Sequence, residues 1–209
     1  MHDIFRGTTV IPVVTIARAA DAVPLATALR RGGLGVIEVT LRTPEAIAAI
    51  EEIAHHLPSV VVGAGTVLTD ADARRAREAG ARFLVSPGLT PDVAAAGLAS
   101  ELPYLPGVVT PSEIMQARDL GLSLLKFFPA MPAGGPAALR AYAQVFAGLA
   151  FCPTGGVTAE NAGEFLALPN VPMVGGGWMA PPDAIEAGDW ARIERLARDA
   201  AAITPSRPH

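Results

Sequence analysis

The chain has 209 residues, a formal net charge of −4 and a hydrophobic content of 51%. This length and apolar content are enough for the buried core of one domain. The acidic balance and the lack of a basic cluster argue against nucleic-acid binding. A single cysteine, Cys152, excludes an internal disulfide and suits a reducing compartment. The first apolar run is too short for a signal peptide or a membrane span, so we expect a cytoplasmic protein without membrane contact.

Short apolar, β-branched runs alternate with Ala-, Leu-, Arg- and Glu-rich stretches of helical period along the whole chain. The runs predict strands over residues 10–16, 36–41, 60–67, 83–87, 103–109, 124–129, 149–155 and 171–177. The stretches between them predict helices over residues 20–33, 44–57, 70–80, 90–100, 111–121, 135–146, 159–168 and 189–203.

Eight strand–helix units at a spacing of about 20–25 residues are typical of a (β/α)8 barrel, the TIM-barrel fold. The strands are apolar on both faces, as expected of parallel strands that are buried on both sides. No linker or low-complexity segment interrupts the pattern. We therefore expect a single barrel domain over residues 1–209, with a short N-terminal lead-in and a frayed tail after about residue 203.

Two ionisable residues, Glu38 and Lys126, lie inside predicted apolar strands. Strand side chains alternate, so Glu38 shares one face with Thr40 and Arg42. A charge at such a position must be paired or neutralised. One interpretation is therefore a structural ion pair, either Glu38–Arg42 or Glu38–Lys126.

Lys126 is the only lysine in the chain, and the other 15 cationic side chains are all arginine. Arginine suits a structural buried pair better, because its guanidinium binds a carboxylate through two hydrogen bonds and stays charged. Lysine offers an amine that can lose its proton. Burial beside a second cation, here Arg42, lowers the pKa of an amine and makes it a nucleophile toward carbonyls. This pattern favours a Schiff-base lysine.

Glycine clusters follow the last two predicted strands, in PTGGVT (153–158) and GGGW (175–178). In a (β/α)8 barrel the loops after strands seven and eight commonly bind phosphate through backbone N–H groups. Thr66 ends the third predicted strand. Its hydroxyl could bind a substrate carboxylate beside Arg42, or could cap the strand end.

These segments resemble the 2-keto-3-deoxy-6-phosphogluconate (KDPG) and 4-hydroxy-2-oxoglutarate (KHG) aldolase family. The matching segments are EVTLRT (38–43), VGAGTVL (62–68), SPGLT (86–90), KFFPA (126–130), FCPTGG (151–156) and GGGWM (175–179). The resemblance implies that Lys126 forms the imine with the C2 ketone and that Glu38 is the general acid and base. It also implies the following substrate-binding residues: Arg42 and Thr66 at the carboxylate, Pro87 and Phe128 around the pyruvate methyl, Thr154, and Gly155, Gly156, Gly176 and Gly177 at the distal phosphate.

The implied activity is that of a class I aldolase, a lyase that needs no metal and no cofactor. Its products would be pyruvate and glyceraldehyde 3-phosphate from KDPG, as in the Entner–Doudoroff pathway, or pyruvate and glyoxylate from KHG. The family is typically homotrimeric. Gly177 stands where the family often has serine, and Met131 stands where an acidic residue is common. Arg18 could reach a phosphate or a second carboxylate, or could be a solvated loop residue.

Three alternatives stay open at this level. The chain could be an aldolase for another 2-keto-3-deoxy sugar acid. It could be a sugar-phosphate isomerase or epimerase on the same barrel, which would leave the buried lysine unexplained. It could also be a non-enzymatic binding module with Lys126 in a structural pair, because a fold alone does not decide function.

Overall fold

A computed structural model describes residues 3–205 of the chain, which form an α/β domain with parallel strands. The part of the predicted frayed tail beyond residue 205 lies outside the described residues. The strands are β1 (Val10–Val14), β2 (Val36–Thr40), β3 (Val61–Gly65), β4 (Leu84–Val85), β5 (Tyr104–Leu105), β6 (Gly107–Val108), β7 (Leu124–Phe127), β8 (Ala150–Pro153) and β9 (Val174–Gly176). The α-helices are α1 (Ala22–Arg31), α2 (Ala46–His56), α3 (Asp70–Glu78), α4 (Pro91–Ala99), α5 (Pro111–Asp119), α6 (Gly135–Val145), α7 (Ala162–Leu166), α8 (Pro182–Glu186) and α9 (Trp190–Ala201).

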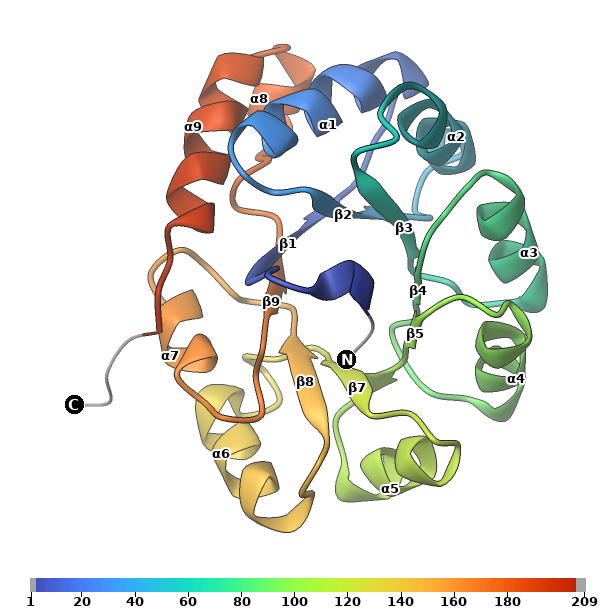
Figure 1. Ribbon diagram of the computed structural model, residues 1–209, viewed down its shortest axis with the longest axis vertical. Helices are drawn as coiled ribbons and strands as arrows, with labels where there is room; N and C mark the ends of the chain where they lie inside the picture. Colours follow the sequence, from blue (N-terminus) through green and yellow to red (C-terminus); the bar gives the residue numbers. More distant parts are fainter. Residues whose placement is uncertain (1–2, 206–209) are drawn as a thin grey trace.

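The strands form two parallel sheets that curl around a common centre, with the helices outside them (Figure 1). One sheet has six strands in the order β5-β4-β3-β2-β1-β9, and the other has three in the order β6-β7-β8. A single parallel bridge, between Thr154 and Gly175, links the end of β8 to β9. Because all the pairings are parallel, the carboxyl ends of the strands lie on the same side of the domain.

The predicted fifth strand, over residues 103–109, is divided into β5 and β6 at Pro106. Proline has no backbone N–H and cannot donate to a ladder of strand hydrogen bonds. Before Pro106 the chain pairs with β4, through Leu84 with Tyr104. After it the chain pairs with β7, through Gly107 with Lys126. The expected single sheet of eight strands is therefore observed as two sheets that meet at this proline.

All eight predicted helices are present, although α7 is shorter than the sequence pattern indicated. Short helices that the sequence analysis did not predict are α8 and two 3-10 turns, η1 (Asp3–Phe5) and η2 (Ala19–Asp21). Each of these three elements has five residues or fewer, too few to display a helical period.

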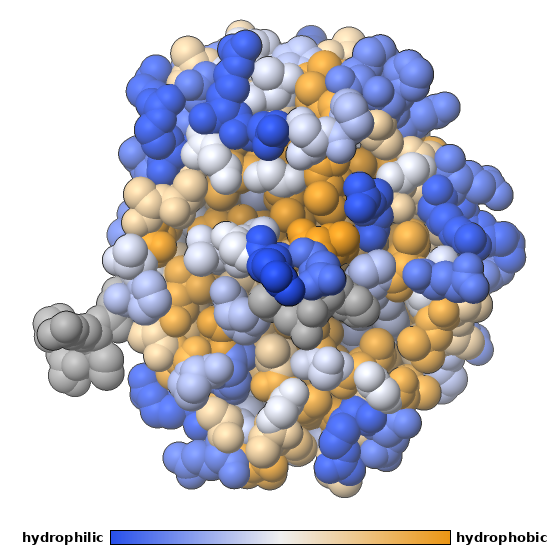
Figure 2. All heavy atoms as spheres, in the orientation of Figure 1, coloured by the Kyte–Doolittle hydropathy of each residue, from blue (hydrophilic) through white to orange (hydrophobic). Residues whose placement is uncertain are grey.

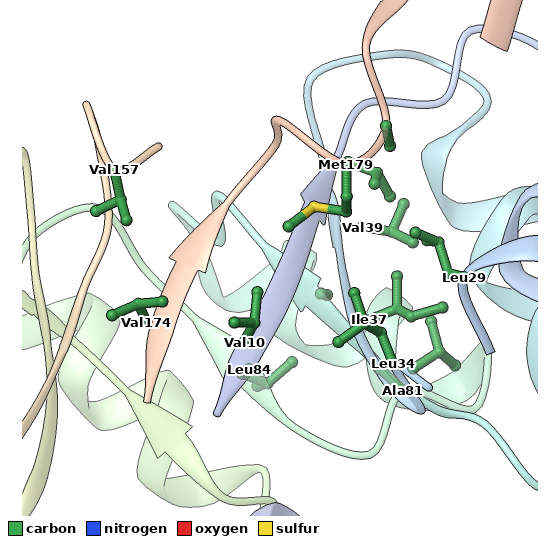
Figure 3. Close-up of a cluster of buried hydrophobic side chains, with 14 of the residues drawn as sticks. Val10, Leu29, Leu34, Ile37, Val39, Ala81, Leu84, Val157, Val174 and Met179 are labelled. Carbon is green, nitrogen blue, oxygen red and sulfur yellow. The ribbon is translucent and has the colours of Figure 1, made fainter. Parts of the chain in front are cut away.

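Buried apolar side chains form a large cluster between the strands and the helices. Figure 3 shows part of it, in which Ile37 and Val39 of β2 lie near Leu29 of α1, while Val10 and Val174 lie on the neighbouring strands β1 and β9. A smaller cluster lies inside the curl of the strands and includes Phe5. The element that carries Phe5, η1, covers the centre of the strands (Figure 1).

Hydrophilic side chains gather over the outer helices on the face drawn in Figure 2, while apolar side chains show between them. Within residues 3–205, no helix is long and apolar enough to cross a membrane.

Candidate active site

Glu38 on β2 and Lys126 on β7 meet inside the curl of the strands, although 88 residues separate them in the sequence. The Lys126 Nζ donates a hydrogen bond of 3.0 Å to the Glu38 Oε1. The two side chains are only 7% and 5% exposed. Of the two ion pairs left open by the sequence, the structure contains Glu38–Lys126.

Two neighbouring residues shape this pair. The ring of Phe128 lies with its centroid 5.2 Å from the Lys126 Nζ, within the range of a cation–π contact. Gly65, at the end of β3, lies beside Glu38: a Cβ on Gly65 would come within 2.7 Å of the Glu38 Cγ. The carboxylate therefore needs a glycine at position 65. A buried amine in hydrogen-bond contact with a carboxylate has the geometry of a nucleophile with its general base.

Arg42 and Thr66 follow adjacent strands at their carboxyl ends. The backbone N–H of Leu41 donates to the carbonyl of Gly65 over 2.8 Å, which holds the two loops side by side. Arg42 is exposed and has no ion pair within residues 3–205. Thr66 has a φ of 61°, a left-handed conformation that is uncommon for a residue other than glycine. Such strain concentrates at functional sites.

Pro87 and Phe128 are both half-buried and lie after β4 and β7. A Cβ on Gly107 would overlap the carbonyl of Pro87, so the backbones of β6 and the loop after β4 pack closely. The strand that carries Lys126 pairs with β6. Pro87 and Phe128 therefore lie just beyond the ends of β4 and β7, and β6 contacts both the loop that carries Pro87 and the strand that leads to Phe128.

The predicted glycine sites lie after β8 and at the end of β9. Gly155 and Gly156 have φ angles of 96° and 76°, which favour glycine, and a Cβ on Gly155 would lie 3.3 Å from the Phe128 ring. Gly176 is buried in β9, and Gly177 is exposed just after it. The bridge at Thr154 links these two strand ends, so both glycine clusters lie at one edge of the site.

The sequence analysis did not single out Thr15, which follows β1. Its Oγ1 lies 2.8 Å from the Oγ1 of Thr40, which is buried two residues beyond Glu38 on β2. Thr15 also lines a cavity of about 370 Å³ that includes Gly177. A threonine is an ordinary strand residue, so its residue type gave no signal in the sequence.

The same cavity is lined by Arg18, Asp21 and Glu186. The guanidinium of Arg18 donates two hydrogen bonds to the Asp21 carboxylate, of 2.8 and 3.0 Å, and this contact raises the pKa of Arg18. Asp21 is the N-cap residue of α1, so this ion pair lies within the loop that joins β1 to that helix. Arg18 therefore lines the cavity but is already engaged.

Cys152 is buried beside Lys126, its register partner on β8. Burial raises the pKa of this thiol to about 12, so it stays protonated at neutral pH. It behaves as a small core residue rather than as a nucleophile. Among the described residues, no group of three or more His, Cys, Asp or Glu side chains could hold a metal ion.

Comparisons of the sequence with known proteins all point to one family. The sequence model of the KDPG and KHG aldolase family matches residues 1–196. A 2-dehydro-3-deoxy-phosphogluconate aldolase of Pseudomonas aeruginosa is 47% identical over 195 residues, which are 93% of this chain and 89% of that protein. A KHG/KDPG aldolase of Escherichia coli K12 is 48% identical over 191 residues, 91% of this chain and 90% of that protein.

Solved structures agree with these matches. A KDPG aldolase of Legionella pneumophila, with pyruvate captured as a covalent carbinolamine intermediate, has a TM-score of 0.92 and 45% identity, covering 96% of each chain. A 2-keto-3-deoxy-6-phosphogluconate aldolase of Zymomonas mobilis ZM4 with 3-phosphoglycerate has a TM-score of 0.91 and 45% identity. It covers 97% of this chain and 95% of its own.

Proposed function

This chain belongs to the KDPG and KHG aldolase family, and we propose that it is a class I aldolase that cleaves KDPG, KHG or both to release pyruvate. The observation that carries this proposal is the buried contact of 3.0 Å between the only lysine and Glu38. An enzyme of the imine type needs a lysine amine and a group that moves protons next to it. The chain supplies both in one place.

The chemistry proceeds through an imine on Lys126. The amine attacks the C2 carbonyl to form a carbinolamine, and loss of water gives a protonated imine. The C4 hydroxyl then loses its proton to Glu38, directly or through a water, as the C3–C4 bond breaks. The electron pair of that bond enters the imine and leaves a neutral enamine, while the aldehyde departs.

Glu38 next returns its proton to C3 of the enamine, and water hydrolyses the resulting imine to free pyruvate and the lysine amine. Acid–base assistance of this kind contributes about 10²–10⁴-fold to the rate. The Glu38 carboxylate lies within hydrogen-bond distance of the amine in the free enzyme. It can therefore serve each proton transfer without a change of backbone position.

The family resemblance gives the binding roles, and the positions of the other side chains support them. Arg42 and Thr66, on neighbouring loops at the carboxyl end of β2 and β3, would hold the carboxylate of the keto acid. Pro87 and Phe128, which are half-buried after β4 and β7, would enclose the C3 carbon that becomes the pyruvate methyl group. Thr154, buried just after β8, is the remaining side chain that we propose for substrate binding.

The distal phosphate would be bound by the glycine clusters. Gly155 and Gly156 have positive φ angles, and Gly177 is exposed, so the backbone at these three positions would let an anion approach closely. Gly176 is buried in β9 opposite Pro12 and would support the loop that carries Gly177. The Thr154–Gly175 bridge keeps the ends of β8 and β9 together.

We also propose that the two sheets form one closed (β/α)8 barrel domain. The pairing of β5 with β4, the pairing of β6 with β7 and the bridge to β9 support closure on both sides. The family resemblance further implies a homotrimer that acts without a metal or a cofactor, and the single cysteine and short first apolar run favour a cytoplasmic location.

A cleavage assay that measures pyruvate release from KDPG and from KHG tests the proposed function. Lys126→Arg keeps the positive charge opposite Glu38 but cannot form an imine at neutral pH. We expect kcat to fall by at least about 10³-fold, as for other losses of a nucleophile. Arg118→Lys, an exposed exchange of one cation for another, is the matched control and should keep wild-type activity. A Lys126→Arg protein that cleaves either substrate at the wild-type rate would contradict the proposal.

A further inference from the structure

The pair of hydroxyls at Thr15 and Thr40 has a fixed direction of donation. The Thr40 Oγ1 donates to the carbonyl of Val14 over 3.1 Å. A threonine hydroxyl has one proton, so Thr40 has none left for Thr15. In the 2.8 Å contact between the two hydroxyls, Thr15 must therefore be the donor. The Thr15 oxygen is left with free lone pairs and no proton to give.

Thr15 presents this acceptor to the cavity that also includes Gly177. The ionisable side chains that line this cavity are two carboxylates, Asp21 and Glu186, and one guanidinium, Arg18. Asp21 takes both hydrogen bonds of the Arg18 contact. That contact uses two of the five N–H groups of Arg18, so the lining keeps N–H donors on Arg18 for an anion and has acceptors at Thr15 and Glu186 for a ligand group that donates.

The position of Thr15 relates it to the reaction. Val13 on β1 is level with Glu38 on β2, so Thr15 lies two residues, or about 7 Å, further toward the carboxyl ends of the strands. Gly177, one of the glycines assigned to the distal phosphate, lines the same cavity. Thr15 therefore lies between the level of the catalytic pair and the distal end of the site.

From this geometry, and resting on the proposed aldolase function, we propose that Thr15 is a specificity-determining residue that accepts a hydrogen bond from the C5 hydroxyl of the substrate. KDPG carries a hydroxyl at C5, which can donate. KHG carries a carboxylate at C5, which at neutral pH only accepts. Thr15 then favours the substrate with a hydroxylated distal half over the substrate with a carboxylate there.

Kinetics of Thr15→Val with the two substrates test this role. The substitution keeps the shape of the side chain and removes only the hydroxyl. We expect kcat/KM for KDPG to fall about tenfold, the effect of losing one hydrogen bond of about 1.4 kcal/mol, and kcat/KM for KHG to stay within about twofold. Thr15→Ser, which keeps the hydroxyl, should restore most of the selectivity.

Thr43→Val is the matched control. Thr43 also lies at the carboxyl end of β2, but its hydroxyl donates to the carbonyl of Ile16 over 2.6 Å and lies outside the cavity. Its loss should leave the ratio of the two kcat/KM values unchanged. An unchanged ratio in Thr15→Val, or an equal fall with both substrates, would overturn the role of Thr15.

A failure of the proposed Thr15 role can be distinguished from a failure of the proposed aldolase function. Pyruvate lacks the distal half of the substrate. Borohydride should therefore trap pyruvate on Lys126 of Thr15→Val to the same extent as on the wild-type protein. A wild-type enzyme that traps pyruvate but cleaves KHG alone would overturn the role of Thr15 and leave the aldolase mechanism intact. A wild-type enzyme that traps no pyruvate and cleaves neither substrate would overturn both.

Discussion

Glu38 reaches Lys126 because the neighbouring residue on β3 has no side chain. Gly65 pairs with Thr40, and a Cβ on it would lie within 2.7 Å of the Glu38 Cγ and Cδ. Carbon atoms in contact ordinarily lie about 3.5–4.0 Å apart, so the Glu38 side chain would have to move. Its carboxylate would then leave the position from which it contacts the lysine.

We therefore predict that Gly65→Ala lowers kcat strongly and the free energy of unfolding only moderately. kcat should fall by about 10²-fold or more, since misplaced acid–base groups lose most of their effect. The free energy of unfolding should fall by about 1–3 kcal/mol from overpacking. Gly35→Ala, just before β2, has room for the added methyl group and is the control. Steady-state kinetics and urea unfolding give both quantities, and wild-type kcat in Gly65→Ala would show that Glu38 does not depend on this glycine.

The sequence singled out Glu38 and Lys126 because ionisable groups are rare in buried strands. Glu38 and Lys126 stood out against apolar neighbours, and a buried charge needs a partner. The choice between Arg42 and Lys126 as that partner could not be made from the sequence, because it depends on how β2 and β7 curve toward each other. Thr15 gave no signal, since threonine is common in strands and its meaning comes from a contact with Thr40 on another strand.

Helix positions on the outside of the strands depend on local signals that are easy to recognise in the sequence. α5 follows β6 with a capping box: the Thr110 Oγ1 accepts from the backbone N–H of Glu113, and the Glu113 Oε2 accepts from the backbone N–H of Thr110. The same carboxylate also accepts from the N–H of Val109, which lowers the pKa of Glu113 despite its partial burial. The cap thus fixes the loop that leaves β6.

We predict that Thr110→Ala destabilises the protein by about 1 kcal/mol, the usual cost of losing an N-cap. Ser112→Ala, an exposed change in the first turn of the same helix, should stay within about 0.5 kcal/mol of the wild type. Urea unfolding monitored by circular dichroism measures both. Equal stabilities for the two variants would mean that the cap contributes nothing to the fold.

Strand limits were harder to predict than helix starts. The run over residues 103–109 is uniformly apolar apart from its prolines and glycine, and only the change of partner at Pro106 divides it. Hydrogen-bond partners of a strand lie far along the chain, so no local pattern specifies them. Helix caps are contained within four residues, which explains why the helices predicted from residues 90 and 111 agree with the observed starts at Pro91 and Pro111.

On the scale of the whole molecule, the N-terminal turn η1 closes one end of the curl of strands. Phe5 is fully buried, and its ring meets that of Phe83 edge to face with centroids 5.2 Å apart. Their cluster includes residues from six of the nine strands described, among them Leu124 and Cys152. Glu38 and Lys126 lie on two of these strands, two residues beyond Val36 and Leu124 of the cluster, so the cluster packs beneath the pair and holds β2 and β7 in place.

Phe5→Ala should therefore cost about 3–5 kcal/mol of unfolding free energy, as expected when a large core side chain is removed. Val145→Ala, at a position 71% exposed, should change it by less than about 0.5 kcal/mol. Chemical denaturation of both proteins gives the comparison. A loss below about 1 kcal/mol in Phe5→Ala would show that η1 is not part of the core.

We propose above all that Lys126, the only lysine of this chain, forms an imine with a keto acid. The most direct measurement is reduction with borohydride in the presence of pyruvate, followed by the mass of the intact protein and of its peptides. We predict the mass increase of one reduced pyruvyl group, located on Lys126 and absent from Lys126→Arg. Since no other lysine exists, the N-terminal amine is the only other primary amine to distinguish. A folded protein that gains no pyruvyl group, or gains it only at the N-terminus, would contradict the account.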